Sequence, residues 1–249
     1  MKQIMEEKAQ NYKNGKINYV TEKVVKDSTI TLTINNEISR SLSAIEDSLE
    51  EFAVGYLFNE NIVKSLEDIE KIEINENHIN VEIDDKLLKT KETVLCSDSS
   101  GGWRSKIKEI KPISSDFQVE ADELINRIEE LKNNAQIWQA TGGTHVAGIV
   151  YKNNFIVKED VSRHVAVDKV IGYGILHNYD LSNSYVIYSG RMPADMVIKV
   201  VRAGIPVLAS NAAPAYSGCE TAKKGNVTLV GFLRGQRFNV YNNKNRIIF

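Results

Sequence analysis

From residue 185 onward the sequence alternates short apolar strands with helices, and this alternation constrains the fold more than any other feature. Each of the two helices has a proline near its start and a glycine just past its end, Gly204 and Gly225, as is typical of helix boundaries. Because helical crossovers join parallel strands, this part of the chain is predicted to form a parallel sheet with ligands at its carboxyl ends. The strands are predicted over 185–188, 207–209 and 227–232, and the helices over 193–202 and 214–224.

The first part of the chain indicates a smaller, β-rich unit. Residues 19–25 and 29–35 alternate apolar and polar side chains and are expected to pair, with a turn at Asn35 and Asn36. A second hairpin is predicted from 69–74 and 79–83. Between the two hairpins, Asp47 is expected to cap a helix whose apolar side supports the small sheet.

A proline-containing linker separates this unit from the rest. Pro112 restricts the chain within a polar segment, which predicts two domains, 1–112 and 113–249. Past the linker, apolar spacing predicts a helix over 124–131, continued after a break by 136–140, and then a hairpin of 145–151 with 155–157.

Composition excludes several classes of protein. The net charge of −2 gives no reason to expect nucleic-acid binding. The start of the chain is polar and no segment approaches the roughly 20 apolar residues of a membrane helix, so a cytoplasmic protein without membrane contact is expected. With only Cys96 and Cys219, a disulfide framework and a four-cysteine zinc site are excluded.

The run 158–172 carries carboxylates on both sides of Arg163 and His164 above a narrow apolar stripe, so its polar face is predicted to be a site. The Asp168 carboxylate, one helical turn further on, is expected to orient the His164 ring. His145 follows a Gly-Gly turn and serves either a site or simply a backbone hydrogen bond. The two histidines lack a third ligand at a recognisable spacing, so no metal site is predicted.

Two loops at predicted strand ends carry arginines. Ser189, Gly190 and Arg191 join a strand to a helix, and residues 231–238 add two arginines beside aromatic rings. Free amides, guanidinium forks and rings suit a ligand with phosphates and a guanine base. The alternative is that each arginine is simply solvated, but several such loops on one sheet favour a ligand.

The two cysteines differ in their surroundings. Cys96 precedes a Ser/Gly loop with Arg104 and Lys106 nearby in sequence, so it is either a small buried apolar residue or a reactive thiolate. Cys219 lies inside a predicted helix and is expected to pack.

Together these motifs resemble the FdhD family of formate dehydrogenase accessory proteins, which are sulfur carriers. The resemblance covers nearly the whole chain and rests on residues 46–57, 141–145, 159–172, 189–191, 203–210, 213–214, 229–235 and 237–241. It implies an α/β fold, α+β overall, in which a small β-rich N-terminal domain precedes a three-layer domain similar to cytidine deaminases.

The resemblance also implies a function. A cysteine desulfurase would place sulfur on Cys96 as a persulfide, and the protein would transfer it to the bis-guanylated molybdenum cofactor, molybdenum bis(molybdopterin guanine dinucleotide), bound as substrate. Formate dehydrogenase would be the client, and a homodimer is expected. The guanine-bearing cofactor is expected to be bound by Phe232, Leu233, Arg234, Gly235, Gln236 and Arg237, which match the family's binding segment, together with Arg191, Arg163, His164, Thr141, Gly142, Gly143 and His145.

One departure from the family pattern changes the chemistry. Cys96 matches the first cysteine of a Cys-x-x-Cys motif, but Ser99 stands at the position of the second. A second thiolate could discharge a persulfide by forming a disulfide, and a serine hydroxyl cannot. A molybdenum-cofactor chaperone that carries no sulfur is therefore the alternative. A deaminase is set aside because no glutamate stands two positions after His145 and Ala215, not cysteine, follows Pro214.

Overall fold

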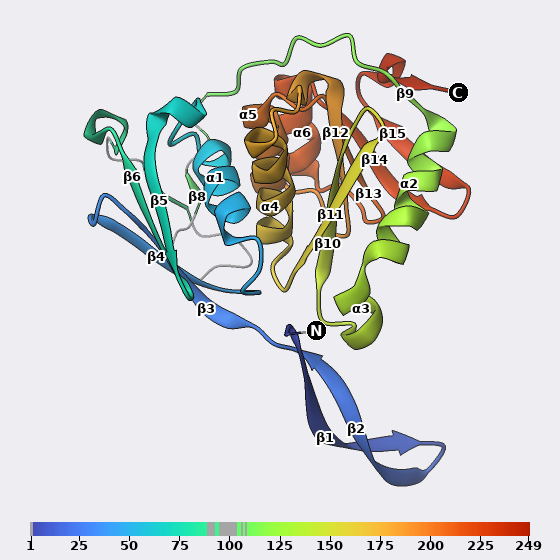
Figure 1. The fold of residues 1–249 in the computed structure, drawn as a ribbon. Helices are drawn as coiled ribbons and strands as arrows, with labels where there is room; N and C mark the ends of the chain where they lie inside the picture. Colours follow the sequence, from blue (N-terminus) through green and yellow to red (C-terminus); the bar gives the residue numbers. More distant parts are fainter. Residues whose placement is uncertain (1, 89–92, 95–103, 106, 108) are drawn as a thin grey trace.

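The computed structural model describes residues 2–88, 93–94, 104–105, 107 and 109–249 of the chain. They form a protruding β-hairpin, a four-stranded sheet, a six-stranded sheet and six α-helices (Figure 1). No helix among these residues has both the length and the apolar character needed to cross a membrane.

The chain begins with a hairpin of β1 (Ile4–Lys13) and β2 (Lys16–Val25), which extends away from the body of the molecule (Figure 1). Asn14 and Gly15 both have positive φ, 52° and 79°, as a two-residue hairpin turn requires. The expected pairing of 19–25 with 29–35 is therefore wrong, because this turn folds β2 back onto β1.

The next strands build the four-stranded sheet in the order β4-β3-β6-β5. Asn35 and Asn36 form the turn as predicted, and it joins β3 to β4. The predicted hairpin around residues 75–78 is confirmed as β5 and β6. The strands are β3 (Ser28–Ile34), β4 (Ile38–Ala44), β5 (Ile69–Asn75) and β6 (His78–Ile83), with short 3-10 turns η1 (Leu66–Asp68) and η2 (Asp85–Leu88) and a separate short pair, β7 (Thr93–Val94) with β8 (Arg104–Ser105).

Helix α1 (Leu49–Asn59) packs Phe52, Leu57 and neighbouring side chains against this sheet, as predicted. Asp47 does not cap it: the residue before the helix is Ser48, whose φ is 53°, and the Ser48 hydroxyl donates to the Asp47 carboxylate. The Asp47 carboxylate therefore bonds a neighbouring side chain, and Ser48 makes no side-chain cap either.

The six-stranded sheet has the order β11-β10-β12-β13-β14-β15, in which β12, β13 and β14 are parallel as predicted. Figure 1 shows helices on both of its faces. One core joins the sheet to α4, α5 and α6, and another joins it to α2, so this part of the chain has three layers. The strands are β10 (His145–Tyr151), β11 (Asn154–Asp160), β12 (Ser184–Tyr188), β13 (Val207–Ser210), β14 (Thr228–Arg234) and β15 (Arg237–Tyr241).

The helices of these layers include every segment predicted to be helical in this part of the chain. They are α2 (Ala121–Asn134), α3 (Gln136–Thr141), α4 (Arg163–Leu176), α5 (Ala194–Ala203) and α6 (Tyr216–Gly225), with η3 (Leu181–Asn183), η4 (Lys244–Arg246) and a pair of short strands, β9 (Val119–Glu120) and β16 (Ile247–Ile248), completing the chain. Gly204 ends α5 in the left-handed region as predicted. At the end of α6, however, that role belongs to Asn226 and not to Gly225, which is still helical.

Helices α1 and α4 lie side by side and join the two sheets (Figure 1). Their backbones touch at Gly55 and Gly172. A Cβ at Gly55 would lie 1.9 Å from the Asp168 carbonyl oxygen, and one at Gly172 would lie 1.8 Å from the Glu51 carbonyl oxygen. Only glycine at both positions permits this approach.

Candidate functional site

The candidate site lies along one edge of the six-stranded sheet, which we call the carboxyl edge. There β11, β12, β13 and β14 end, and β10 and β15 begin. Ligands of open α/β sheets collect at such an edge. Each predicted binding residue lies at the end or the start of one of these strands, or in the segment that adjoins it.

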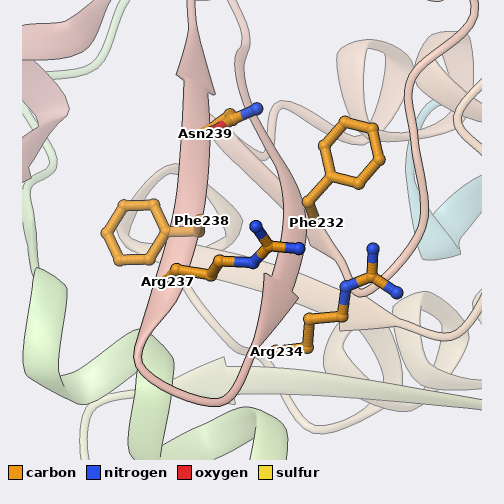
Figure 2. A pocket seen from close by; sticks show the side chains of 5 residues that line it. All are labelled: Phe232, Arg234, Arg237, Phe238 and Asn239. Atoms are coloured by element: carbon orange, nitrogen blue, oxygen red, sulfur yellow. The ribbon is translucent and has the colours of Figure 1, made fainter.

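At the end of β14, five side chains line a hollow of about 250 Å³, which we call the arginine pocket: Phe232, Arg234, Arg237, Phe238 and Asn239. Figure 2 shows both guanidinium groups on the same side of the β14–β15 hairpin as the Phe232 ring, while the Phe238 ring extends from the other side of β15. The Arg234 guanidinium carbon lies 5.9 Å from the centroid of the Phe232 ring. Two cations and an aromatic face are thereby held over one small space.

An irregularity in the ladder aims these side chains. The pairing of β14 with β15 shifts between Gly231 and Arg234, and Phe232 within this bulge has a φ of 56°. The Phe232 amide donates to the Ala212 carbonyl in the loop after β13 (3.0 Å). Bulges often redirect a side chain beside a functional site.

Strand alternation separates the pocket residues from the core. Leu233 is fully buried in the core beneath α2, so its side chain does not line the pocket. Asn239 was not predicted, although it stands two residues after Arg237 and so shares its face of β15. That period of two was the signal available in the sequence.

The loop after β12 is held by neighbouring segments of the carboxyl edge. Ser210 at the end of β13 donates to the Gly190 carbonyl (2.7 Å), and Tyr188 donates to the Arg191 carbonyl (2.5 Å). Burial raises the pKa of Tyr188 well above its ordinary value, so the phenol keeps its proton and this bond. The Arg191 side chain is exposed.

His145 begins β10 and is fixed from the same loop. Its Nδ1 lies 2.7 Å from the Ser189 carbonyl oxygen, and the Ser189 hydroxyl accepts a bond from the Val146 amide (2.9 Å). A carbonyl only accepts, so Nδ1 carries the proton and Nε2 of the neutral ring is an acceptor. The backbone hydrogen bond considered for His145 is thus present. It involves Nδ1 alone, so Nε2 can accept a hydrogen bond from another group.

His164 lies in the first turn of α4 and is fully buried. Its Nε2 is 3.4 Å from the Asp195 carboxylate at the start of α5. The expectation that Asp168 orients this ring is wrong, because Asp168 accepts bonds from Lys199 and from Asn59 (2.6 Å). Arg163 is half-buried, and its side chain passes beside Gly190.

Residues 141–143 connect α3 to β10. The Thr141 hydroxyl donates to the Ile137 carbonyl (2.7 Å) and accepts from the Gly143 amide (3.1 Å). Gly142 ends α3 with a φ of 67°. This turn is exposed at Gly142 and Gly143, and Val25 at the base of the β1–β2 hairpin lies against Gly143.

The polar face predicted for 158–172 serves mainly to hold the fold together. Asp160 and Lys169 form a fully buried ion pair (2.8 Å), and Asp160 also accepts from the Ile45 amide (3.1 Å). Burial raises the pKa of Asp160, while Lys169 acts in the opposite direction. Glu159 accepts from the first amides of α3, at Ile137 (2.8 Å) and Trp138 (2.7 Å), a capping role that sequence reasoning missed.

Cys96, the predicted sulfur-bearing residue, lies outside the described residues, as does Ser99. Cys219 is half-buried and packs against the core shared by α5 and α6, as expected. Among the described residues no group of three or more His, Cys, Asp or Glu side chains could hold a metal ion. The pocket side chains include cations, rings and an amide but no nucleophile, so this end of the molecule is suited to binding.

Fold and site together define an α/β protein whose mixed sheet carries an arginine-lined pocket at its carboxyl edge. Residues 25–248 match the FdhD/NarQ family, and the chain belongs to that family.

Relatives agree over almost the full length. The chain is 48% identical to the sulfur carrier protein FdhD of Methanothermobacter thermautotrophicus over 92% of this chain and 93% of that protein. It is 34% identical to the protein FdhD of Methanocaldococcus jannaschii, over 92% of each. A crystal structure of a protein assigned as a formate dehydrogenase accessory protein from Desulfotalea psychrophila superposes with a TM-score of 0.82 at 27% identity, covering 98% of this chain and 99% of that one.

Proposed function

We propose that this protein is a sulfurtransferase that accepts sulfur from a cysteine desulfurase as a persulfide on Cys96 and transfers it to the bis-guanylated molybdenum cofactor required by formate dehydrogenase. The names of its relatives, sulfur carrier protein and formate dehydrogenase accessory protein, support a role in sulfur delivery. The observation that carries the binding half of the proposal is the arginine pocket.

The pocket fits one end of such a substrate. Arg234 and Arg237 present guanidinium groups that pair with phosphate oxygens, and the Phe232 ring offers a face for a purine. At about 250 Å³ the hollow is slightly smaller than pockets that enclose drug-sized ligands, which begin at roughly 300 Å³. It therefore suits a nucleotide end, with the remainder of the cofactor outside it.

The sulfur half of the proposal follows thiol chemistry. The Cys96 thiolate attacks the terminal sulfur of the desulfurase persulfide, the sulfur–sulfur bond of that persulfide breaks, and the desulfurase cysteine leaves as a thiolate. Cys96 then carries one additional sulfur, and no external oxidant is required. With Ser99 at the second motif position, release as sulfide needs a thiol from another molecule, which forms a mixed disulfide with Cys96 and supplies the electrons.

Binding is tested by titrating guanosine diphosphate into the protein in a calorimeter. Removing both pocket guanidinium groups, in Arg234→Ala with Arg237→Ala, is expected to weaken binding by about a hundredfold or more, since each charge-assisted bond contributes roughly 1.5–3 kcal/mol. Arg40→Ala, which removes a half-buried arginine from β4 in the other sheet, is the matched control. Equal affinity in all three proteins would contradict the assignment of the pocket.

Sulfur transfer is tested by incubating the protein with a cysteine desulfurase and cysteine, followed by mass spectrometry of its peptides. One added sulfur atom is expected on the Cys96 peptide, absent in Cys96→Ser and retained in Cys219→Ser. Label found elsewhere, with the Cys96 peptide unchanged, would overturn the mechanism.

Ser99 favours one other function, a chaperone that holds the molybdenum cofactor without carrying sulfur. The two proposals differ in one outcome: formate dehydrogenase maturation fails in Cys96→Ser if sulfur rides on this thiol, and persists if the protein only binds the cofactor. A cytoplasmic location, association with the desulfurase and with the formate dehydrogenase catalytic subunit, and a three-layer domain of the cytidine deaminase type remain predictions.

A further inference from the structure

A second hollow lies at the opposite edge of the six-stranded sheet, where β10 ends and β12 begins, and we call it the amino-edge pocket. Its volume is about 520 Å³, larger than the arginine pocket and within the roughly 300–1,000 Å³ of sites that enclose small molecules. Four segments line it: the stretch before β9, helix α2, the β10–β11 turn and the stretch from residue 180 into β12. Figure 1 shows the chain after residue 112 passing along this end of the molecule toward β9 and α2.

The walls of the amino-edge pocket are tied to one another. The Ser115 hydroxyl donates to the Ser182 carbonyl of η3 (2.7 Å) and accepts from the Phe117 amide (3.1 Å). On β12, the Tyr185 hydroxyl donates to the Glu123 carboxylate of α2 (2.9 Å). These bonds hold the lining segments together without a ligand. A preformed site loses less conformational entropy when it binds.

Aromatic side chains supply much of the lining. Phe117, Tyr151 and Tyr185 all face the pocket, and the rings of Phe117 and Tyr185 lie 6.1 Å apart between centroids. The ammonium group of Lys152, on the β10–β11 turn, lies 4.9 Å from the centroid of the Tyr151 ring. Aromatic faces attract cations, and the one cation of the lining already lies over a ring. The walls are therefore suited to a ligand that carries positive charge.

The polar groups of the lining favour the same charge. Bonds from Ser182 and Asn183 lower the pKa of Asp180, so this carboxylate is ionised at neutral pH. The Asn183 side-chain nitrogen donates to Asp180 (2.7 Å), as the Tyr185 hydroxyl does to Glu123. Donors of the lining are thus directed at its own carboxylates, and oxygen atoms are left to accept from a ligand. Two carboxylates against one ammonium group give the pocket a net negative charge.

A guanidinium group meets these requirements best. It is planar, stacks on aromatic faces, stays charged at every ordinary pH and presents five N–H donors in a fork that matches carboxylates. An ammonium group is a compact, strongly hydrated charge and makes less use of the aromatic walls. The same chemistry excludes phosphates, so this pocket and the arginine pocket select opposite ligands.

We propose that the amino-edge pocket binds a guanidinium group on an apolar stem, as in arginine, carried by a free small molecule or by a peptide. The proposal is independent of the proposed function, because it uses the opposite edge of the sheet and no residue of the arginine pocket.

Calorimetry with matched ligands tests the charge. L-Arginine amide is expected to bind saturably, with one molecule per chain, and to bind at least tenfold more tightly than L-citrulline amide, in which an uncharged carbamoyl group replaces the guanidinium. Glycyl-arginyl-glycine amide, titrated in parallel, identifies the source: tighter binding than arginine amide indicates a peptide, and weaker binding indicates a free small molecule. Equal binding of the arginine and citrulline amides, or no saturable binding of either, overturns the proposal.

Two substitutions with opposite expected effects test the location. Glu123→Gln removes a carboxylate but keeps an acceptor oxygen for Tyr185, and it should weaken binding of arginine amide by about tenfold. Lys152→Gln removes the competing cation from an exposed turn and should strengthen binding by about threefold. Damage to the fold does not strengthen binding, so the pair is not explained by misfolding.

Glu129→Gln makes the same charge change on an exposed position of α2 and is the matched control, with unchanged affinity expected. Guanosine diphosphate should bind equally to all these variants, so a failure here is distinguishable from a failure of the arginine pocket. Equal affinity for arginine amide in the natural chain, Glu123→Gln and Lys152→Gln would contradict the assignment of the amino-edge pocket.

Discussion

Phe232 carries its ring into the arginine pocket from a backbone conformation that residues other than glycine rarely adopt. Its φ is 56°, within a bulge of β14, and its amide is held by the Ala212 carbonyl. The left-handed region costs an L-residue roughly 1–2 kcal/mol. The backbone conformation that places this aromatic face beside two guanidinium groups therefore lowers the stability of the fold.

Two substitutions at this position separate the ring from the backbone. Phe232→Ala and Phe232→Gly both remove the ring, so both are expected to lose affinity for guanosine diphosphate to the same extent. Glycine alone adopts positive φ freely, so Phe232→Gly should be more stable than Phe232→Ala by about 1 kcal/mol. Urea unfolding measures the difference, and an alanine variant as stable as the glycine variant would refute the strain.

Asp160 and Lys169 are a second place where the fold carries a local energetic cost. Both charged side chains are fully buried, and each is the ion-pair partner of the other. Lys169→Met is expected to destabilise the protein at neutral pH by about 3–5 kcal/mol, since it leaves a buried carboxylate without its cation. Burial already raises the pKa of Asp160 above its ordinary value of 3.8, and losing Lys169 raises it further. A carboxyl group with a raised pKa favours the folded state below 3.8, and this contribution is lost as pH rises through the raised pKa.

The deficit of Lys169→Met relative to the natural chain should therefore be largest at neutral pH and shrink as pH falls toward 3.8, because protonation of Asp160 removes the buried charge that has lost its cation. Unfolding by urea over this pH range gives the comparison. The double variant Asp160→Asn with Lys169→Met is the control, because it has no titrating group at this site. A deficit that stays constant with pH would show that lost packing, and not charge, is responsible.

Among the elements, the crossing of α1 and α4 has the least tolerance for added volume. Gly172→Ala is expected to cost about 3 kcal/mol, because the new Cβ would meet the Glu51 carbonyl oxygen at 1.8 Å and helix backbones cannot yield independently. Gly174→Ala on the same helix is the matched control. Its Cβ would meet the Ile149 Cδ1 at 2.9 Å and the Leu181 Cδ2 at 3.2 Å, which are side-chain ends that can move. Thermal unfolding should show a clearly larger loss for Gly172→Ala, and equal losses would contradict backbone contact.

At the scale of the whole molecule, the elements predicted correctly are those whose boundaries are marked by residues close by in the sequence. Strands β12 to β14 with α5 and α6 were found because proline, glycine and apolar runs mark each boundary within a few residues. The hairpin of β1 and β2 was missed although Asn14 and Gly15 are a strong hairpin signal, since its strands are polar along most of their length. The contacts made by Asp160, Asp168 and His164 could not be predicted. Their partners, which are Lys169, Lys199 and Asp195 in that order, are brought close only by the packing of α4 on its neighbours.

The contacts between the two sheets, which we call the joint, are expected to make the two sheets unfold together. The Ile45 backbone bonds to both Asp160 and Lys169, Arg202 on α5 donates to the Asn59 carbonyl at the end of α1 (2.7 Å), and Val165 of α4 belongs to the core of the small sheet. Elements from both sides of residue 112 thus share one interior. The predicted domains 1–112 and 113–249 are expected to unfold together as one cooperative unit.

Two probes on opposite sides of this joint test that expectation. In a Trp103→Phe background, tryptophan fluorescence reports on Trp138 in α3, which lies beyond residue 112. Hydrogen exchange of the β3 and β6 amides, followed by mass spectrometry at increasing urea, reports on the small sheet. Both should give the same unfolding midpoint, and Gly172→Ala should lower both together, because its added Cβ disrupts the contact through which each sheet stabilises the other. Two separate midpoints, with only one displaced by Gly172→Ala, would show that the sheets unfold independently and that the α1–α4 contact holds two self-sufficient domains.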